Sequence, residues 1–224
     1  MFLEYSVIER FRDRRSLFLR CKYSERLTKR FAFEVFIFYL SDLKRCFLTF
    51  VFVLNPKSGA VPPKPTNTFK RDMQVKDLQP ALVFQIFDEI TKVPRPSKKE
   101  GKIRQFLLDF AKKHGLQAKT DAIGNVLISK AATPGHEDAP TVIMQGHMDM
   151  VCESNDKSFD FENSPIETVV DGEWVHAKGT TLGADNGIGV AAALAAMLDD
   201  SYVHGPLEAL VTVDEETGMT GANN

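Results

Sequence analysis

Three short groups of residues in the second half of the chain carry side chains that could bind a metal ion. In the first group, His147 and Asp149 lie two residues apart at the end of the apolar run 141–146. Alternate residues of a strand project to the same face, so both side chains would point the same way. A neutral imidazole is a good zinc ligand, and a nearby carboxylate can orient its second ring nitrogen. The alternative is a histidine at a strand end followed by a turn residue.

The second group is the glycine-rich string 179–189, in which Asp185 stands close to the start of an expected helix. A phosphate loop would end in Gly-Lys-Ser or Gly-Lys-Thr, and a dinucleotide-binding turn would have no carboxylate beside the pyrophosphate. The string meets neither condition. Asp185 could instead supply both of its oxygens to two cations. The alternative is that Asp185 only caps the helix.

The third group is the run of acids Asp214-Glu215-Glu216, which follows the apolar run 207–213. Acids packed together at a strand end repel one another unless a cation is present or water screens them. One of them could therefore bind a metal ion while its neighbour handles a proton. The alternative is a solvated run of charge with no chemical role.

All three groups are expected just beyond the carboxyl ends of strands, where α/β folds gather their active sites. A histidine, a bridging aspartate and a pair of glutamates are the ligands that two zinc ions about 3.5 to 4 Å apart would require. The sequence therefore predicts that His147, Asp185 and Glu216 converge around a pair of cations.

The elements that would position these groups follow from hydrophobic periodicity and from helix and turn signals. Helices are predicted at 77–91, from a cap at Ser97 to a left-handed stop at Gly115, and at 187–198, where the alanine-rich sequence predicts burial against a sheet. Strands are predicted at 117–121 and 125–129, as a hairpin, and at 141–146, 174–177 and 207–213. Helices that alternate with strands indicate an α/β fold with a mixed, largely parallel sheet flanked by helices.

Composition divides the chain into two unlike parts. Residues 1–72 hold 15 basic and 7 acidic residues and 11 of the 17 phenylalanines, whereas residues 73–224 hold 13 basic and 23 acidic residues. Prolines and a glycine between 55 and 65 predict a linker. We therefore expect residues 1–72 to be a Phe-rich basic segment separate from a globular part at 73–224. The net charge of −2 argues against a nucleic-acid partner.

The apolar stretch 31–54 approaches the length of a membrane span but contains charged residues. Each would cost about 2.5 to 3.5 kcal/mol near the centre of a transmembrane helix, which argues against a membrane partner; they are Glu34, Asp42, Lys44 and Arg45. The cysteines show no paired spacing, so we expect a reducing, cytoplasmic setting without a disulfide framework; they are Cys21, Cys46 and Cys152.

Residues 73–224 resemble the bacterial cytosolic non-specific dipeptidases, also called aminoacyl-histidine dipeptidases or peptidase D, of the di-zinc dipeptidase and aminoacylase superfamily. The resemblance is carried by residues 90–97, 121–128, 145–151, 171–189, 204–208 and 215–221. It implies that His147 ligates one zinc ion, Asp185 bridges both ions and Glu216 ligates the second. It also implies that Glu215 is the general base, that Asp149 orients His147, and that the peptide bond after Asp185 is cis.

The activity implied by the resemblance is hydrolysis of dipeptides, Xaa-His types included, by a water activated between two Zn²⁺ ions, which Co²⁺ or Mn²⁺ could replace. Two alternatives stay open: a related di-zinc deacylase or aminopeptidase, and a non-catalytic or membrane-associated product. Family members are longer, with a further acidic ligand, a final histidine ligand and a lid domain that contributes to homodimer formation. We therefore expect an N-terminal fragment of the catalytic domain, truncated at Asn224, with an over-extended reading frame at 1–72.

Overall fold

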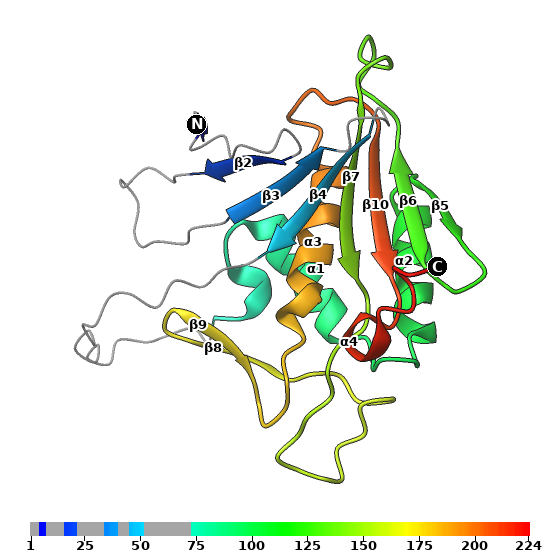
Figure 1. Ribbon diagram of the computed structural model, residues 1–224. Coiled ribbons are helices and arrows are strands. Elements are labelled where there is room, and N and C mark those ends of the chain that lie inside the picture. The colour runs from blue at the N-terminus through cyan, green and yellow to red at the C-terminus, as the bar shows by residue number, and fades with distance from the viewer. Residues whose placement is uncertain (1–4, 8–15, 22–33, 40–44, 52–72) are drawn as a thin grey trace.

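The structure, a computed structural model, describes residues 5–7, 16–21, 34–39, 45–51 and 73–224. An eight-stranded sheet organises the chain, in the order β1-β2-β3-β4-β7-β10-β6-β5 (Figure 1). The first four strands are β1 (Tyr5–Val7), β2 (Ser16–Cys21), β3 (Glu34–Tyr39) and β4 (Arg45–Val51). The other four are β5 (Gln117–Thr120), β6 (Val126–Lys130), β7 (Thr141–His147) and β10 (Leu207–Thr212).

The predicted mixed α/β fold is confirmed, but most neighbouring strands are antiparallel. Parallel pairing joins β4 to β7 and β7 to β10, at the centre of the sheet. The other pairs of the sheet are antiparallel, so the prediction of a largely parallel sheet is wrong. The reason is connection length: a short turn makes β5 and β6 an antiparallel hairpin, whereas the parallel pair β7 and β10 needs a long crossover that contains a helix.

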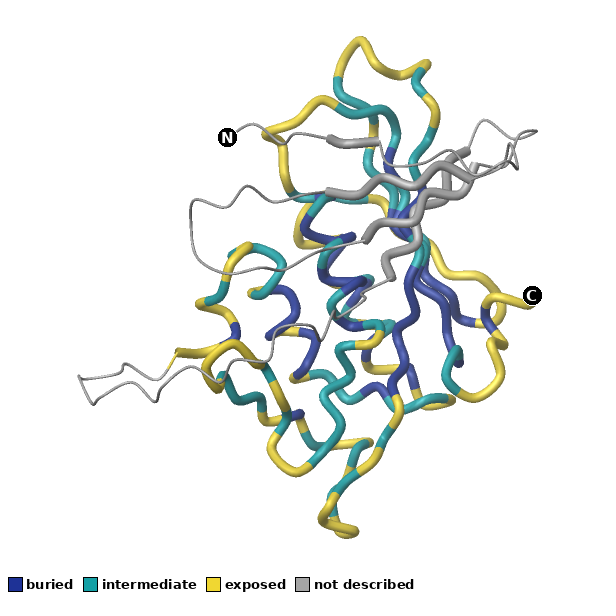
Figure 2. Tube along the Cα trace, turned by 60° about the vertical axis from the view of Figure 1, so that its left-hand side comes forward, coloured by how far each residue is buried: buried dark blue, intermediate teal, exposed yellow. Residues whose placement is uncertain are grey.

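Three helices lie on the sheet or on one another: α1 (Ala81–Thr91), α2 (Gly101–Lys113) and α3 (Ala184–Leu198). In Figure 1 they lie together behind β7, β10 and β6. Helix α3 contacts β7 and β10, α1 packs on α3, and α2 contacts β5 and β6. The apolar faces of these elements form one core, which Figure 2 shows in dark blue between the helices and the strands. This arrangement holds the carboxyl ends of β7 and β10 beside the start of α3.

Helix α3 has the composition of a helix enclosed on several sides. Val190, Ala191 and Leu194 are buried, and Ala193 and Ala195 on other faces are buried as well. Small side chains let α1 and the sheet approach the helix closely from different directions. The predicted buried helix at 187–198 is thus confirmed, with a start three residues earlier, at Ala184.

Two predicted helix starts are wrong. The helix predicted at 77–91 begins only at Ala81, after Pro80, and a short 3₁₀ turn at Val75–Asp77 precedes it. Ser97 does not cap the second helix, because that helix begins at Gly101 and its N-cap residue is Glu100. The chain turns through a left-handed residue at Lys98 between the two positions. The Ser97 side chain lies against Asp149 instead.

The predicted turns and strands between residues 115 and 177 are largely confirmed. Gly115 has the expected left-handed conformation, with φ of +69°. Strands β5 and β6 form the predicted hairpin, and β9 (Trp174–Ala177) is present. The sequence analysis missed β8 (Thr168–Asp171), which pairs only with β9 in a separate two-stranded sheet. Its four residues are too few to show a period-2 pattern.

Strands β1 to β4, which the sequence analysis did not predict, extend the sheet beyond β7. The linker predicted between residues 55 and 65 lies outside the described residues, as does part of the apolar stretch 31–54. The division into a separate segment at 1–72 and an enzyme part at 73–224 stays a prediction. Within the described ranges, no helix combines the length and the apolarity needed to cross a membrane.

Candidate metal centre

The structure brings His147, Asp185 and Glu216 together although they are distant in sequence. One ligand atom of each residue lies within 4.8 Å of those of the other two. His147 is the last residue of β7, Asp185 lies at the start of α3, and Glu216 follows the end of β10. The predicted convergence beyond the carboxyl ends of parallel strands is therefore present in the fold, while the role of each residue as a metal ligand stays a prediction.

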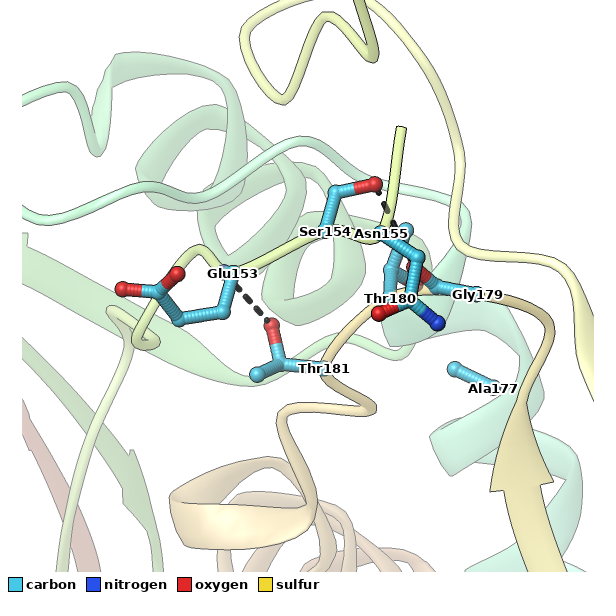
Figure 3. A pocket seen from close by; sticks show the side chains of 7 residues that line it. All are labelled: Glu153, Ser154, Asn155, Ala177, Gly179, Thr180 and Thr181. Carbon is cyan, nitrogen blue, oxygen red and sulfur yellow. Dashed lines mark hydrogen bonds between the residues drawn. The ribbon is translucent and has the colours of Figure 1, made fainter. Parts of the chain in front are cut away.

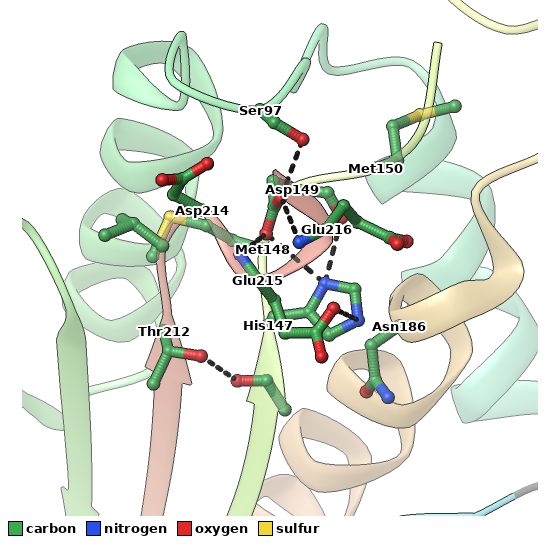
Figure 4. Close-up of polar contacts among 12 residues, drawn as sticks. Ser97, His147, Met148, Asp149, Met150, Asn186, Thr212, Asp214, Glu215 and Glu216 are labelled. Carbon is green, nitrogen blue, oxygen red and sulfur yellow. Dashed lines mark hydrogen bonds and ion pairs between the residues drawn. The ribbon is translucent and has the colours of Figure 1, made fainter. Parts of the chain in front are cut away.

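The His147 ring is buried and is held at both nitrogens (Figure 4). Its Nδ1 lies 3.3 Å from the Asp149 Oδ1 and 3.2 Å from the Asp149 carbonyl oxygen. Its Nε2 lies 3.1 Å from the Asp185 Oδ1. Both ring nitrogens thus face acceptors, and the tautomer in which Asp149 holds the proton on Nδ1 leaves the lone pair of the neutral ring on Nε2. That nitrogen faces the other two members of the cluster, as a metal ligand would.

Asp149 is fully buried, with 0% of its surface exposed, and it joins the parts of the site. Oδ1 accepts the backbone N–H of Glu215 at 3.0 Å, while Oδ2 accepts the Glu216 N–H at 3.2 Å and the Ser97 hydroxyl at 2.7 Å. Burial alone would raise the pKa of Asp149, but His147 and these donors outweigh it and hold the pKa well below its ordinary value. A permanent negative charge therefore faces the His147 ring.

That charge also acts on His147. Burial by itself would lower the pKa of the imidazole, but the hydrogen bond and charge of Asp149, the hydrogen bond of Asp185 and the charge of Glu215 raise it. A site that attracts a proton to the ring in this way also attracts a metal cation.

Asp185 stands at an irregular start of α3. The peptide bond between Asp185 and Asn186 is cis, as the resemblance implies, and both residues have non-helical backbone angles. The Asp185 side chain is 82% exposed. Its Oδ1 approaches the Nε2 of His147.

The glycine-rich string has a steric function at this point. A Cβ on Gly189 would lie 2.2 Å from the Asn186 Oδ1, and a Cβ on Gly146 would lie 2.7 Å from the same atom. At either distance the Asn186 amide would have to move to admit a side chain. Gly146 and Gly189 therefore leave room for the side-chain amide of Asn186, the residue that follows the cis peptide bond of Asp185. This packing explains the glycines at both positions without a phosphate ligand.

The three acids after β10 do not act as one group. Glu215 and Glu216 begin the short helix α4 (Glu215–Gly218), and the Glu215 Oε2 lies 3.9 Å from the His147 Nε2. Burial raises the pKa of Glu216; the His147 charge lowers it, and the neighbouring acids Asp185, Glu215 and Asp149 raise it further. Such mutual repulsion is what a bound cation would relieve.

Asp214 has a different role from its two neighbours. Its backbone is left-handed, with φ of +50°, and its carboxylate accepts the hydroxyls of Thr217 and Thr220. Its backbone N–H donates to the Glu100 Oε1 at 3.0 Å. Glu100, Asp149 and Asp214 form a second acidic cluster, but internal donors satisfy all three carboxylates. This second cluster therefore shapes the loop that carries Glu215 and Glu216.

Sequence analysis missed several residues that support the centre, namely Arg95, Ser97, Glu100 and Asn186. Ser97 was interpreted as a helix cap, and Arg95 was given no role of its own, although residues 90–97 contribute to the resemblance. A basic residue between two prolines, immediately after an apolar helix, was the available signal for Arg95. For Ser97, the capping interpretation used a hydroxyl whose actual partner is a carboxylate 52 residues away.

A pocket of about 350 Å³ is lined by residues of 153–155 and 177–181, in the part of the chain between His147 and Asp185 (Figure 3). Its walls are mostly polar: the Ser154 hydroxyl donates to the Gly179 carbonyl, and the Glu153 N–H donates to the Thr181 hydroxyl. The lining residues are Glu153, Ser154, Asn155, Ala177, Gly179, Thr180 and Thr181. None of them belongs to the cluster around His147, so the pocket is separate from the candidate metal centre.

Comparison with known proteins agrees with this geometry. Residues 143–224, which include all of the candidate centre, match the family described as Peptidase family M20/M25/M40. The described part of the chain thus has the mixed α/β architecture of an M20 peptidase catalytic domain, of which it covers a part.

Three known proteins are similar to this chain over roughly two thirds of its length. The chain is 47% identical over 150 residues to the cytosol non-specific dipeptidase of Escherichia coli K12, which covers 66% of this chain and 31% of that protein. The structure of aminoacylhistidine dipeptidase from Vibrio alginolyticus matches with a TM-score of 0.65 at 47% identity, covering 68% of this chain and 31% of that one. Aminopeptidase PepT from Bacillus cereus matches with a TM-score of 0.53 at 25% identity, covering 63% and 38%.

These matches confirm the resemblance to the cytosolic dipeptidases over the part that they cover. The chain spans about a third of the length of each of these relatives.

Proposed function

We propose that this chain carries the metal-binding part of a dipeptidase that hydrolyses unblocked dipeptides, Xaa-His among them. The observation that supports this most directly is the meeting of His147, Asp185 and Glu216 within 4.8 Å of one another, with Glu215 beside them. The names of the Escherichia coli and Vibrio alginolyticus relatives support the dipeptide substrate. The first of those names also supports a cytoplasmic location.

The donor set fits zinc. One imidazole nitrogen and two carboxylates are the ligands that catalytic zinc sites use. We infer that His147 holds one ion, Glu216 a second, and that Asp185 bridges them, since its carboxylate is exposed. Each ion needs further ligands from outside the described residues. Zn²⁺, when bound, would lower the pKa of a water molecule toward neutrality and polarise the substrate carbonyl.

The protein's own groups would then handle the proton. Glu215, whose Oε2 lies 3.9 Å from the His147 Nε2, is not one of the proposed ligands, and its carboxylate would take a proton from the attacking water and return it to the leaving amine. Asp149 would keep the His147 ring in the tautomer that offers Nε2. Asp149 would also fix the backbone of Glu215 and Glu216 through the two amides that it accepts.

The test is zinc-dependent hydrolysis of Ala-His by the purified chain, with zinc binding measured separately. Glu215→Gln should keep zinc binding and lower kcat by about 100-fold or more. Glu216→Gln should weaken zinc binding itself. The same assay on an N-acetylated amino acid distinguishes a deacylase, and on a tripeptide an aminopeptidase. A wild-type chain that binds no zinc would refute the proposal.

A further inference from the structure

Arg95 is a buried arginine whose guanidinium contacts backbone carbonyls next to the candidate metal centre. It is not one of the proposed metal ligands. Arg95 is 2% exposed, and its Nε has no hydrogen-bond partner among the described residues. Arginine is almost never fully buried unless its charge is paired or its donors are used. What the guanidinium contacts therefore indicates its role.

The guanidinium connects the two segments that supply His147 and Asp185. Nη1 donates to the carbonyl oxygens of Met148 at 3.3 Å and Asp149 at 3.2 Å, immediately after His147. Nη2 donates to the carbonyl of Gly183, two residues before Asp185. The planar fork of arginine can reach acceptors on both segments at once, which a lysine ammonium on a single flexible stem does less well.

The backbone of Arg95 adds a further connection. The Met150 N–H donates to the Arg95 carbonyl at 3.1 Å, and Pro96 forms an isolated parallel bridge with Met150. The segment around Arg95 is thus fixed to the chain that follows β7 before the side chain reaches across. Because the Arg95 backbone is held in this way, its guanidinium reaches the Gly183 carbonyl from a defined position.

Two glycines of the string 179–189 make room for this guanidinium. A Cβ on Gly183 would lie 2.4 Å from the Arg95 Nη2, and a Cβ on Gly187 would lie 2.8 Å from the same atom. Gly183 also has φ of +67°, but Gly187 has no such backbone requirement. The space that Gly187 leaves is therefore explained by the arginine and by Phe87, whose ring lies 3.1 Å from the same point.

The charge of Arg95 matters as well as its hydrogen bonds. Burial lowers the pKa of Arg95 to about 10, while the charges of Asp149, Glu216 and Asp185 oppose that decrease. The side chain remains a cation at neutral pH. It attracts the same carboxylates that repel one another around His147, and it does so without occupying their oxygens.

We propose that Arg95 is a positioning residue that sets the spacing between His147 and Asp185 by joining the end of β7 to the segment before α3. This inference rests on the proposed metal-dependent function, and it assigns the role to a residue that touches neither metal nor substrate. Loss of the guanidinium hydrogen bonds should let the two segments separate. His147 and Asp185 would then no longer be held at the right spacing before the metal binds.

The experiment compares Arg95→Met, which removes charge and donors, with Arg95→Lys, which keeps the charge but loses the planar fork of donors. Zinc affinity, measured by competition with a chelator, should fall by about 10- to 100-fold in Arg95→Met. It should fall less in Arg95→Lys. Lys130→Met is the matched control, because Lys130 is a part-buried cation that bonds Asp200 at the opposite end of the sheet. Its zinc affinity should stay within about twofold of wild type.

Amide hydrogen exchange of the metal-free chain gives a readout that does not depend on metal or activity. Residues 147–150 and 183–187 should exchange faster in both Arg95 variants and at the wild-type rate in Lys130→Met. A wild-type chain that binds no zinc would refute the proposed function, yet this exchange pattern would still test the positioning role. Unchanged exchange in Arg95→Met would overturn the inference.

Gly187→Ala tests the same contact from the other side and covers the case in which Arg95→Met does not fold. The added methyl group should displace the guanidinium and weaken zinc binding when Arg95 is present. In the Arg95→Lys background the same substitution should cost less, because the shorter head group leaves space. Equal losses in both backgrounds would show that Gly187 and Arg95 act independently, and would contradict the proposal.

Discussion

The Ser97 hydroxyl donates to the Oδ2 of Asp149 across 2.7 Å, which joins the loop before α2 to the end of β7. The same oxygen accepts the backbone N–H of Glu216 at 3.2 Å. Asp149 therefore receives donors from two separate loops while its other oxygen faces His147 and Glu215. A buried carboxylate with this many donors is held in a single orientation.

Replacement of Ser97 by Ala should loosen that orientation without removing any proposed ligand. We expect zinc affinity to fall by about tenfold, in the range found for residues that orient metal ligands, and the free energy of unfolding to fall by roughly 1 to 2 kcal/mol. Chelator competition and urea denaturation measure the two effects. Ser158→Ala is the control, since Ser158 donates to an exposed aspartate, Asp156. Equal behaviour of the two variants would show that the Ser97 bond has no special role.

Much of the fold between residues 73 and 224 follows from short-range signals. Apolar periodicity located α2, and the alanine-rich run 187–198 located α3. The hairpin of β5 and β6 followed from two short runs around Ile123 and Gly124. Strand direction did not follow, because the pairing of β6 with β10 joins residues about 80 positions apart. Helix ends were also misplaced where a side chain served a distant partner, as at Ser97.

The cluster of the candidate centre could be predicted because a chain has few strand ends and helix starts. At these places this sequence carries a histidine and acidic residues directly after apolar or glycine-rich runs. His147, Asp185 and Glu216 are each marked by a local signal. Their supports are harder to recognise, because Arg95 and Glu100 act through backbone groups more than 50 residues away, at Asp149 and Asp214. Contacts of that kind depend on the three-dimensional arrangement and leave no periodic pattern in the sequence.

Zinc should stabilise the folded chain by mass action. Free zinc at about 100 times its dissociation constant would add about 2.7 kcal/mol to the free energy of unfolding, provided that the unfolded chain does not bind it. His147→Ala should abolish most of that increase. His136→Ala is the control, because His136 is exposed in the loop before β7. Thermal denaturation with and without a chelator checks the effect, and stabilisation that survives in His147→Ala would place the metal elsewhere.

Asp121 should make stability depend on pH at the hairpin of β5 and β6. Burial would raise the pKa of its carboxyl, but the N–H groups of Gly124, Asn125 and Ile123 and the Asn125 amide outweigh it and lower the pKa. A carboxylate with a lowered pKa stabilises the fold above its unfolded pKa, and this contribution is lost as the pH falls through the folded pKa.

The test of this dependence is Asp121→Asn, which has no titration. The variant should be less stable than wild type at pH 7, and the difference should shrink as the pH falls below about 4. Chemical denaturation at several pH values measures it. A difference between wild type and variant that stays constant from pH 7 to pH 3 would contradict the assignment of the shift to Asp121.

Two glycine-to-alanine substitutions inside helices should have opposite effects on stability. Gly101 is the first residue of α2, and a Cβ there would meet nothing within 4 Å. Gly101→Ala should therefore stabilise the chain by roughly 0.5 to 1 kcal/mol, because alanine loses less backbone entropy on folding. Gly189 lies within α3, where a Cβ would be 2.2 Å from the Asn186 Oδ1.

Gly189→Ala should destabilise the chain by about 1 to 3 kcal/mol, since the Asn186 side chain is packed beneath the irregular start of the helix. The displacement should also reach Asp185, so zinc affinity should fall in Gly189→Ala and not in Gly101→Ala. Urea denaturation and chelator competition on the two variants measure both quantities. If Gly189→Ala proved as stable as Gly101→Ala, the Asn186 amide would not need the space that Gly189 leaves. The steric explanation for glycine at position 189 would then fail.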